Sequence, residues 1–331
     1  MKRRFRSVIP GIVLALSASA CQATEHPGAG AFIERAVAEF GLDATEVENL
    51  LARAEFKQSI VDAISRPAES KPWYEYRPIF LNQRRIREGA EFWRENRELI
   101  ANASEEFGVD PQIIVAIIGV ETLYGKITGS YRVLDALATL GFYYPKDLKR
   151  DRSAFFSTEL MHFIKLAKEE NLPLDEVTGS YAGAMGMGQF IPSSYRAYAV
   201  DFDGNGSRDL WRSTADVVAS VANYLHVHGW QPGELISVPA EALTAADPAL
   251  AEPKDYKPVL SAGQIAQKGY HSDAGIPPAR PAAVLRLEGK DEYSYWLTFD
   301  NFYVITRYNR SPLYAMAVLQ LSQEIMREMR G

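Results

Sequence analysis

The 331-residue chain has little cysteine, no excess of positive charge and no long apolar run. Its single cysteine, Cys21, excludes an intramolecular disulfide bond and a cysteine-based zinc site. Lys and Arg together number 36 against 42 Asp and Glu, and this net charge of -6 argues against nucleic acid as the main partner. Hydrophobic residues make up 47% and charged residues 24%, a globular mixture that excludes a disordered chain and a multi-span membrane protein.

Residues 1–20 have the pattern of a secretory signal peptide: a basic head, the apolar run 8–16, and small residues up to Ala20. The run is too short for a transmembrane helix. Small residues directly before Cys21 resemble the lipidation site of bacterial lipoproteins, and Gln22 after it favours the outer membrane. We therefore expect a periplasmic protein lipidated at Cys21, with residues 21–30 as a tether. Simple cleavage that leaves a free thiol is the alternative.

The remaining pattern predicts a mainly α (α+β) protein without internal repeats. Residues 31–105 are helical and amphipathic, and Asp110-Pro111 starts a helix that is apolar on every face. Residues 231–306 read as a linker and a small β region, with strand-like alternation that includes Phe302 to Ile305. A last helix follows Ser311-Pro312 within 307–331.

Glu121 stands at the end of the all-apolar helix. At helical spacing Ile117 and Ile118 share its face. Desolvation raises the pKa of a carboxyl group in such surroundings, which is what a general acid at neutral pH requires. The alternative is a helix-end glutamate that reaches solvent or caps a neighbour.

The segment Gly179–Pro192 contains four glycines within ten positions, which allows backbone to approach a ligand closely. Gln189 in this segment could bind a sugar or orient Glu121. The Gly-Lys-Ser/Thr ending of a phosphate-binding loop is absent from the segment. Glycine-driven packing around a tight turn is the alternative.

Residues 201–209 match the first half of a calcium-binding EF-hand loop. The ligand positions 1, 3, 5 and 7 fall on Asp201, Asp203, Asn205 and the carbonyl of Ser207. Position 12 is Arg212 rather than an acid, so Asp216 would have to close a longer loop, although Ser213-x-x-Asp216 is also a capping box. We expect a bound hard cation here, and a metal-free turn is the alternative.

Aromatic residues are frequent, with 17 Tyr, 15 Phe and 5 Trp, and many lie late in the chain. Tyr308-Asn309 directly precedes a helix start, and Tyr314 lies near the third position of that helix. Aromatic faces and hydroxyl groups suit flat, amphipathic ligands such as sugars. These three residues are therefore better ligand candidates than the strand tyrosines, while core packing accounts for most of the other aromatic residues.

Five blocks in this order resemble the membrane-bound lytic murein transglycosylase B family: Ile118–Gly125, Gly179–Pro192, Asp201–Trp211, Ser220–Tyr224 and Asn301–Asn309. The resemblance spans roughly residues 30–331. It implies a lysozyme-like core over 106–230, containing the metal loop 201–216. It also implies cleavage of the β-1,4 bond from N-acetylmuramic acid to N-acetylglucosamine in peptidoglycan, which leaves a 1,6-anhydro sugar.

The resemblance also implies roles for single residues, with Glu121 on the catalytic position. Positions that line the glycan groove or support the glutamate fall on Ser180, Gln189, Tyr224, Tyr308, Asn309 and Tyr314. A structural Ca²⁺ is implied at Asp201, Asp203, Asn205, Ser207 and Asp216. No organic cofactor is implied, and the partners are peptidoglycan strands and, through a lipid anchor only, a membrane.

The chain departs from the family at one place. The paired arginines that typically follow Tyr-Pro are replaced by an insertion, so that Arg150 or Arg152 could meet the substrate. Two other functions remain open: a lysozyme-type hydrolase that uses the same Glu121, and a catalytically inactive peptidoglycan-binding lipoprotein.

Overall fold

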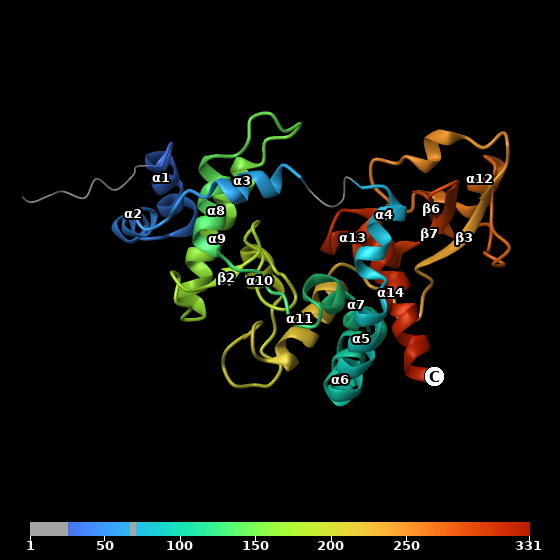
Figure 1. The fold of residues 1–331 in the computed structure, drawn as a ribbon, viewed down its shortest axis with the longest axis horizontal. Helices are drawn as coiled ribbons and strands as arrows, with labels where there is room; N and C mark the ends of the chain where they lie inside the picture. Colours follow the sequence, from blue (N-terminus) through green and yellow to red (C-terminus); the bar gives the residue numbers. More distant parts are fainter. Residues whose placement is uncertain (1–25, 67–70) are drawn as a thin grey trace, which may run out of the picture.

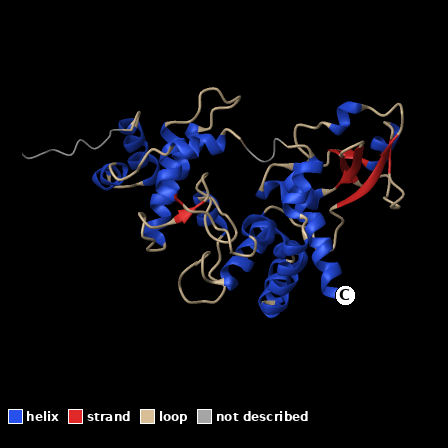
Figure 2. Cartoon of the chain, viewed as in Figure 1, coloured by secondary structure: helices blue, strands red, loops and turns tan. Residues whose placement is uncertain are grey.

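The computed structural model describes residues 26–66 and 71–331, where it has fourteen α-helices and two small sheets (Figures 1 and 2). The predicted signal peptide and Cys21 lie outside the described residues. The predicted fold class, mainly α with a small β region, is confirmed.

The helices of residues 31–105 do not form one region but divide into two groups. The first group packs on α8 (Val133–Phe142) and α9 (Ser153–Glu169), and the second on the centre of the molecule (Figure 1). The first comprises α1 (Ala29–Phe40), α2 (Ala44–Leu51) and α3 (Gln58–Ile64). The second comprises α4 (Trp73–Phe80), α5 (Gln83–Glu95) and α6 (Arg97–Phe107).

Helix α7 (Pro111–Thr122) forms the centre of the main core. Every residue from 113 to 120 is buried, as the apolar pattern predicted. Asp110 occupies the N-cap position and Pro111 the first helical position, although the Asp110 side chain makes no capping hydrogen bond. Each fully buried isoleucine contributes roughly 1.5–3 kcal/mol by leaving water, so this helix is firmly held in place.

Three further helices surround α7: α5, α11 (Thr214–Val227) and α14 (Pro312–Arg330). The side chain of Ser213 caps α11 and that of Ser311 caps α14, each by accepting a backbone N–H at the third position of its helix. The C-terminal helix α14 thus packs in the core beside α7.

Between α9 and α11 the chain runs through short elements and a glycine-rich loop. Strand β2 (Thr178–Gly179) pairs antiparallel with β1 (Tyr131–Arg132), which lies between α7 and α8, and helix α10 (Pro192–Tyr198) follows the loop. Isolated bridges join Met185 to both Gly179 and Phe190, which folds the loop back on itself. The loop is thereby placed against the end of α7.

A five-stranded antiparallel sheet in the order β4-β6-β7-β3-β5 forms the predicted β region (Figure 2). Its strands are β3 (Ser237–Ala242), β4 (Leu260–Ser261), β5 (Tyr270–His271), β6 (Pro281–Glu288) and β7 (Tyr293–Thr298). A 3₁₀ turn, η2 (Pro248–Ala251), and helix α12 (Ala262–Gln267) complete it. The sheet has its own hydrophobic core, which includes Val238, Ile265, Val284 and Leu297.

The strand expected at Phe302 to Ile305 is wrong, because these residues belong to helix α13 (Asp300–Tyr308). Phe302 and Ile305 are three positions apart and both buried, which fits a helix packed against α11 and α14. A short apolar run does not distinguish a strand from a buried helix, and here tertiary packing selects the helix.

Candidate active site

Glu121 lies in the last turn of α7, where the helix is terminated by Leu123 in the left-handed conformation. Its side chain is half-buried. The hydroxyl of Tyr314, from the first turn of α14, donates a hydrogen bond to Glu121 Oε1 at 2.6 Å. Tyr314 is only 2% exposed, so this contact is shielded from water. A hydrogen bond that can become charge-assisted therefore holds the carboxyl group in place.

Tyr308 and Tyr314 form a stacked pair beside Glu121, with their ring centroids 6.4 Å apart and their planes 6° from parallel. The Tyr308 hydroxyl donates to the carbonyl of Gly188 at 2.5 Å. Burial, and secondly the charge of Glu121, raise the pKa of both tyrosine hydroxyls well above the ordinary value. Both hydroxyls therefore remain protonated donors at physiological pH.

A cavity of about 740 Å³ opens on this side of the molecule. Four of the predicted residues line it: Gln189, Tyr224, Tyr308 and Asn309. Glu121, Tyr314 and Ser180 are not among its lining residues. Glu121 is joined to its wall because Tyr314, its hydrogen-bond partner, stacks on Tyr308. We refer to this cavity as the groove.

Two predicted groove residues are fixed by their own hydrogen bonds. Gln189 has a positive φ of 52°, and its side-chain amide donates to the carbonyls of Thr128 and Gly186 at 3.1 and 2.9 Å. The hydroxyl of Tyr224 donates to the carbonyl of Arg307 at 2.6 Å. The polar face of the groove is therefore preformed by contacts within the protein.

Ser180 stabilises the glycine-rich loop. Its Oγ accepts the backbone N–H groups of Ala182 and Ala184 at 3.3 and 3.0 Å. This geometry is a local serine turn, which shapes the backbone that leads to Gln189.

Four arginines line the groove: Arg150, Arg152, Arg307 and Arg310. None of them forms an ion pair with a carboxylate of residues 26–66 or 71–331. The guanidinium group of Arg152 lies over the ring of Phe155 at 4.6 Å, a cation–π contact. Both arginines singled out in the sequence thus reach the groove, and the structure adds two more, which flank Tyr308-Asn309.

The predicted metal loop brings three carboxylates together. One oxygen of each of Asp201, Asp203 and Asp216 lies within 4.8 Å of the others. Asp216 is fully buried in the first turn of α11, and its two oxygens accept the backbone N–H groups of Phe202 and Asp209, both at 2.8 Å. Such a cluster of like charges is favoured when a cation lies between them.

The other predicted features of this loop are compatible with the cluster. Asn205 Oδ1 accepts the N–H of Ser207 at 2.9 Å, while the N–H of Asp216 itself donates to the capping Ser213 Oγ at 3.2 Å. Asp216 therefore combines both roles expected of it, at the helix start and in the acidic cluster. Arg212 contributes no carboxylate, and the loop closes at Asp216 instead.

Comparison with known proteins decides the family. The family model of the transglycosylase SLT domain matches residues 25–323 of the sequence. This chain belongs to the transglycosylase SLT domain family. The resemblance read from the five sequence blocks is thereby confirmed.

The relatives of this SLT transglycosylase include three proteins that are named lytic transglycosylases. Membrane-bound lytic murein transglycosylase B of Escherichia coli K12 is 39% identical over 310 residues, which cover 91% of this chain and 83% of that protein. Soluble lytic transglycosylase SltB1 from Pseudomonas aeruginosa is 44% identical with a TM-score of 0.83, covering 92% of this chain and 100% of that one. The E. coli lytic transglycosylase Slt35, solved in complex with calcium, is 37% identical with a TM-score of 0.80, covering 94% and 96%.

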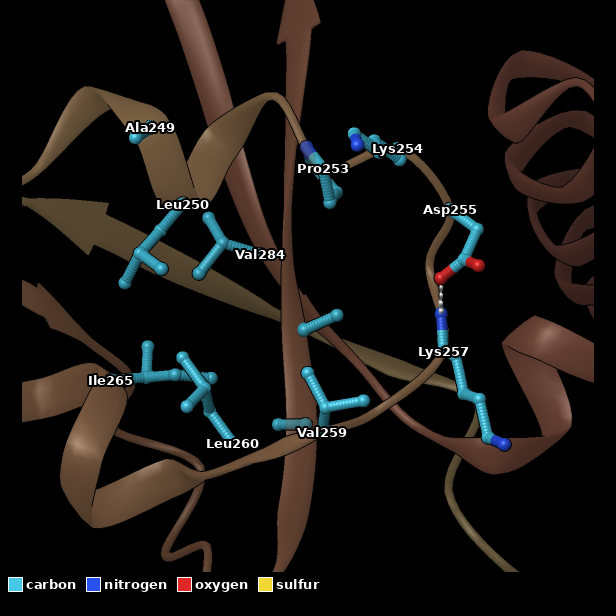
Figure 3. Close-up of a pocket in the computed structure, with 12 residues that line it drawn as sticks. Ala249, Leu250, Pro253, Lys254, Asp255, Lys257, Val259, Leu260, Ile265 and Val284 are labelled. Atoms are coloured by element: carbon cyan, nitrogen blue, oxygen red, sulfur yellow. Dashed lines mark hydrogen bonds between the residues drawn. The ribbon is translucent and has the colours of Figure 1, made fainter.

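The SLT transglycosylase has a second, smaller cavity of about 220 Å³ in the β region (Figure 3). Its lining combines apolar side chains, including Leu260 and Ile265, with the charged residues Lys254, Asp255 and Lys257. It contains none of the predicted site residues, whereas four of them line the groove. Among the described residues, no helix is both long enough and apolar enough to span a membrane.

Proposed function

We propose that this chain is a peptidoglycan lytic transglycosylase with Glu121 as its single acid and base. It cleaves the bond between N-acetylmuramic acid and N-acetylglucosamine and forms a 1,6-anhydromuramic acid end. The observation that carries the proposal is the Tyr314–Glu121 hydrogen bond beside the groove. The family and the names of the lytic murein transglycosylases that resemble the chain support it.

In the proposed reaction, the Glu121 carboxyl group donates its proton to the glycosidic oxygen as the bond from that oxygen to C1 of muramic acid breaks. Positive charge develops on C1 and the ring oxygen. The C6 hydroxyl of the same sugar attacks C1, and the Glu121 carboxylate takes the hydroxyl proton. The new C1–O6 bond closes the anhydro ring, and no water is consumed.

One carboxylate suffices for these two reaction steps. Ordinary glycosidases need a second carboxylate as nucleophile or as base for water. Here the nucleophile belongs to the substrate, and well-oriented intramolecular reactions reach effective concentrations of about 10⁵–10⁸ M. The hydroxyl of Tyr314 orients the Glu121 carboxyl group and stabilises the carboxylate formed in the first step.

The remaining groove residues bind the glycan in this proposal. Gln189 and Asn309 offer amide groups, and Tyr224 and Tyr308 offer aromatic faces, to flat sugar rings. Ser180 acts through the loop that it stabilises. In this proposal, anionic groups of the substrate contact Arg150 and Arg152, which line the groove together with Arg307 and Arg310.

The metal loop binds a structural Ca²⁺ in this proposal. Its ligands are Asp201, Asp203, Asn205, the carbonyl of Ser207 and Asp216, a set of hard oxygen donors that suits calcium. The related Slt35 has been solved in complex with calcium, which supports the proposal. When bound, the ion neutralises the acidic cluster and ties the loop to the start of α11.

We also propose the domain boundaries and the cellular location of the protein. Residues 1–20 are a signal peptide, Cys21 carries a lipid, and residues 21–30 tether the enzyme to the outer membrane, facing the periplasm. A relative named membrane-bound supports the anchor. Residues 106–230 form the lysozyme-like catalytic core, residues 231–306 form a linker and a small β region, and residues 307–331 form a C-terminal helix that returns to the core.

Digestion of purified peptidoglycan sacculi with mass analysis of the products tests the function. We expect soluble fragments with anhydro ends, each lighter by one water than the fragments of a hydrolase. Reducing ends would establish the lysozyme-type alternative. Binding to sacculi without release of fragments would establish an inactive binding protein, and either result would overturn the proposal.

A further inference from the structure

The backbone directly after Glu121-Thr122 takes an unfavourable course. Leu123, Tyr124 and Gly125 have φ values of 51°, 58° and 82°, so three consecutive residues are left-handed. Left-handed conformations cost free energy for residues other than glycine. Such conformations persist only where the surrounding structure enforces them, and they concentrate at functional sites. We refer to residues 123–125 as the elbow.

The side chain of Tyr124 fixes the elbow to helix α5. Its hydroxyl donates to the carbonyl of Arg85 at 2.9 Å, and its ring stacks on Phe92 with centroids 5.5 Å apart. Two glycines leave the space for it: a Cβ atom would lie 2.3 Å from the hydroxyl oxygen at Gly89 and 2.5 Å from it at Gly119. Only glycine at both positions admits this tyrosine.

A second hydrogen bond joins the same two segments, with the donor now on helix α5. Arg85 Nε donates to the carbonyl of Gly119 at 3.0 Å, two residues before Glu121. Arg85 and Tyr124 thus bind each other's segments reciprocally, with the last turn of α7 between them. Helix α5 thereby holds the chain on both sides of Glu121.

The elbow is also attached to the glycine-rich loop. Thr122 Oγ1 donates to the carbonyl of Met187 at 2.8 Å and accepts the N–H of Gly125 at 3.0 Å. The next residue of the loop, Gly188, accepts the hydroxyl of Tyr308. The elbow therefore links α5 to the wall of the groove.

We propose that Tyr124 is a positioning residue, whose hydroxyl, bound to Arg85 between Gly89 and Gly119, holds the elbow that sets the Glu121 carboxyl group against Tyr314. The inference rests on the proposed function. Tyr124 does not line the groove and acts only through the backbone that carries Glu121. Because misplacing a catalytic group by about 1 Å can cost about 100-fold in rate, this support bears directly on kcat.

The test compares Tyr124→Phe with Tyr270→Phe. Tyr270 is a matched control, because it is also buried and also donates to a backbone carbonyl, that of Asp247 at 3.0 Å, but in the separate core of the β region. On soluble peptidoglycan fragments we expect Tyr124→Phe to lower kcat by about tenfold or more with KM within twofold. Tyr270→Phe is expected to keep kcat while losing thermal stability to a similar extent.

A Tyr124→Phe variant that keeps the wild-type kcat per folded molecule would overturn the inference. If Tyr124→Phe does not fold, Arg85→Lys removes the reciprocal hydrogen bond from Arg85 Nε to the carbonyl of Gly119, with the same expected loss of kcat. A crystal structure of the variant decides independently of activity. Retention of the Tyr314–Glu121 hydrogen bond at unchanged length contradicts the inference, whereas an inactive wild-type enzyme contradicts only the proposed function.

Discussion

The Glu121 site and the Asp201–Asp216 loop both place carboxylates at the end of a helix, but at opposite ends. Glu121 lies in the last turn of α7, where the helix presents carbonyl groups and disfavours a fixed negative charge. Asp216 lies in the first turn of α11, where backbone N–H groups favour one. One arrangement suits a group that gives and takes a proton, and the other suits a permanent anion that holds a cation.

The neighbours of the two sites reinforce this contrast. A tyrosine hydroxyl, itself buried, contacts Glu121, whereas two further carboxylates share the space with Asp216. In the proposed function, the carboxylate group thus serves catalysis in one environment and ion binding in the other. The contrast predicts that changes at the first site affect rate, and that changes at the second affect stability.

The largest effect is expected from Glu121→Gln. The amide keeps the shape of the side chain but cannot donate the proton, so kcat on sacculi should fall by about 10²–10⁴-fold with an unchanged melting temperature. The exposed Glu105→Gln is the control and should retain full activity. Near wild-type digestion by the Glu121 variant would rule out its role as the acid.

Removal of calcium is expected to act on stability instead. At a ligand concentration 100 times Kd, a bound ion stabilises by about 2.7 kcal/mol, so chelation should lower the melting temperature of a chain of this length by roughly 4 °C. In Asp203→Ala, added Ca²⁺ should no longer change the melting temperature. A wild-type melting curve that is insensitive to the chelator would argue against a metal site.

A smaller effect on rate is expected from Tyr314→Phe, which removes the hydrogen bond to Glu121. A hydrogen bond to a charged group contributes about 1.5–3 kcal/mol, so kcat should fall by about tenfold or more while KM stays within twofold. Steady-state kinetics on soluble fragments measure this. A rise in KM with unchanged kcat would instead make Tyr314 a binding residue.

The smallest effect is expected at an ordinary surface ion pair, which supplies a baseline for both sites. Hydrogen bonding to Arg196 lowers the pKa of Glu169, so this pair stabilises the protein above the unfolded pKa of about 4.3 and ceases to do so as the pH falls through the lower folded pKa. Arg196→Gln should therefore melt slightly below wild type at pH 7, and the difference should shrink below about pH 4. A difference that is constant with pH would assign the effect to packing.

Both sites could be placed in the sequence because their determinants are local. The apolar helix that ends at Glu121 and the alternating oxygen side chains from Asp201 are contiguous patterns. The hydrogen bond from Tyr314 to Glu121 joins residues 193 positions apart, and no local pattern specifies it. The resemblance to a family suggested that the two belong together, but the contact itself required the structure.

Other features could not be predicted, because they too depend on contacts between distant parts of the chain. Phe302 to Ile305 was expected as a strand because four residues cannot reveal whether they pack as a strand or a helix. Arg307 and Arg310 were not singled out because their neighbouring residues do not indicate which surface an arginine faces. Only the fold brings them to the same wall as Arg150 and Arg152.

The position of α14 has a consequence for biosynthesis. Glu121 is synthesised well before the hydroxyl that contacts it, because Tyr314 follows it by 193 positions in the chain. Since synthesis proceeds from the N-terminus, a chain that has not yet reached Tyr308 lacks this hydrogen bond, together with Tyr308 and Asn309 of the groove. If the proposed function is correct, such a partial chain is inactive.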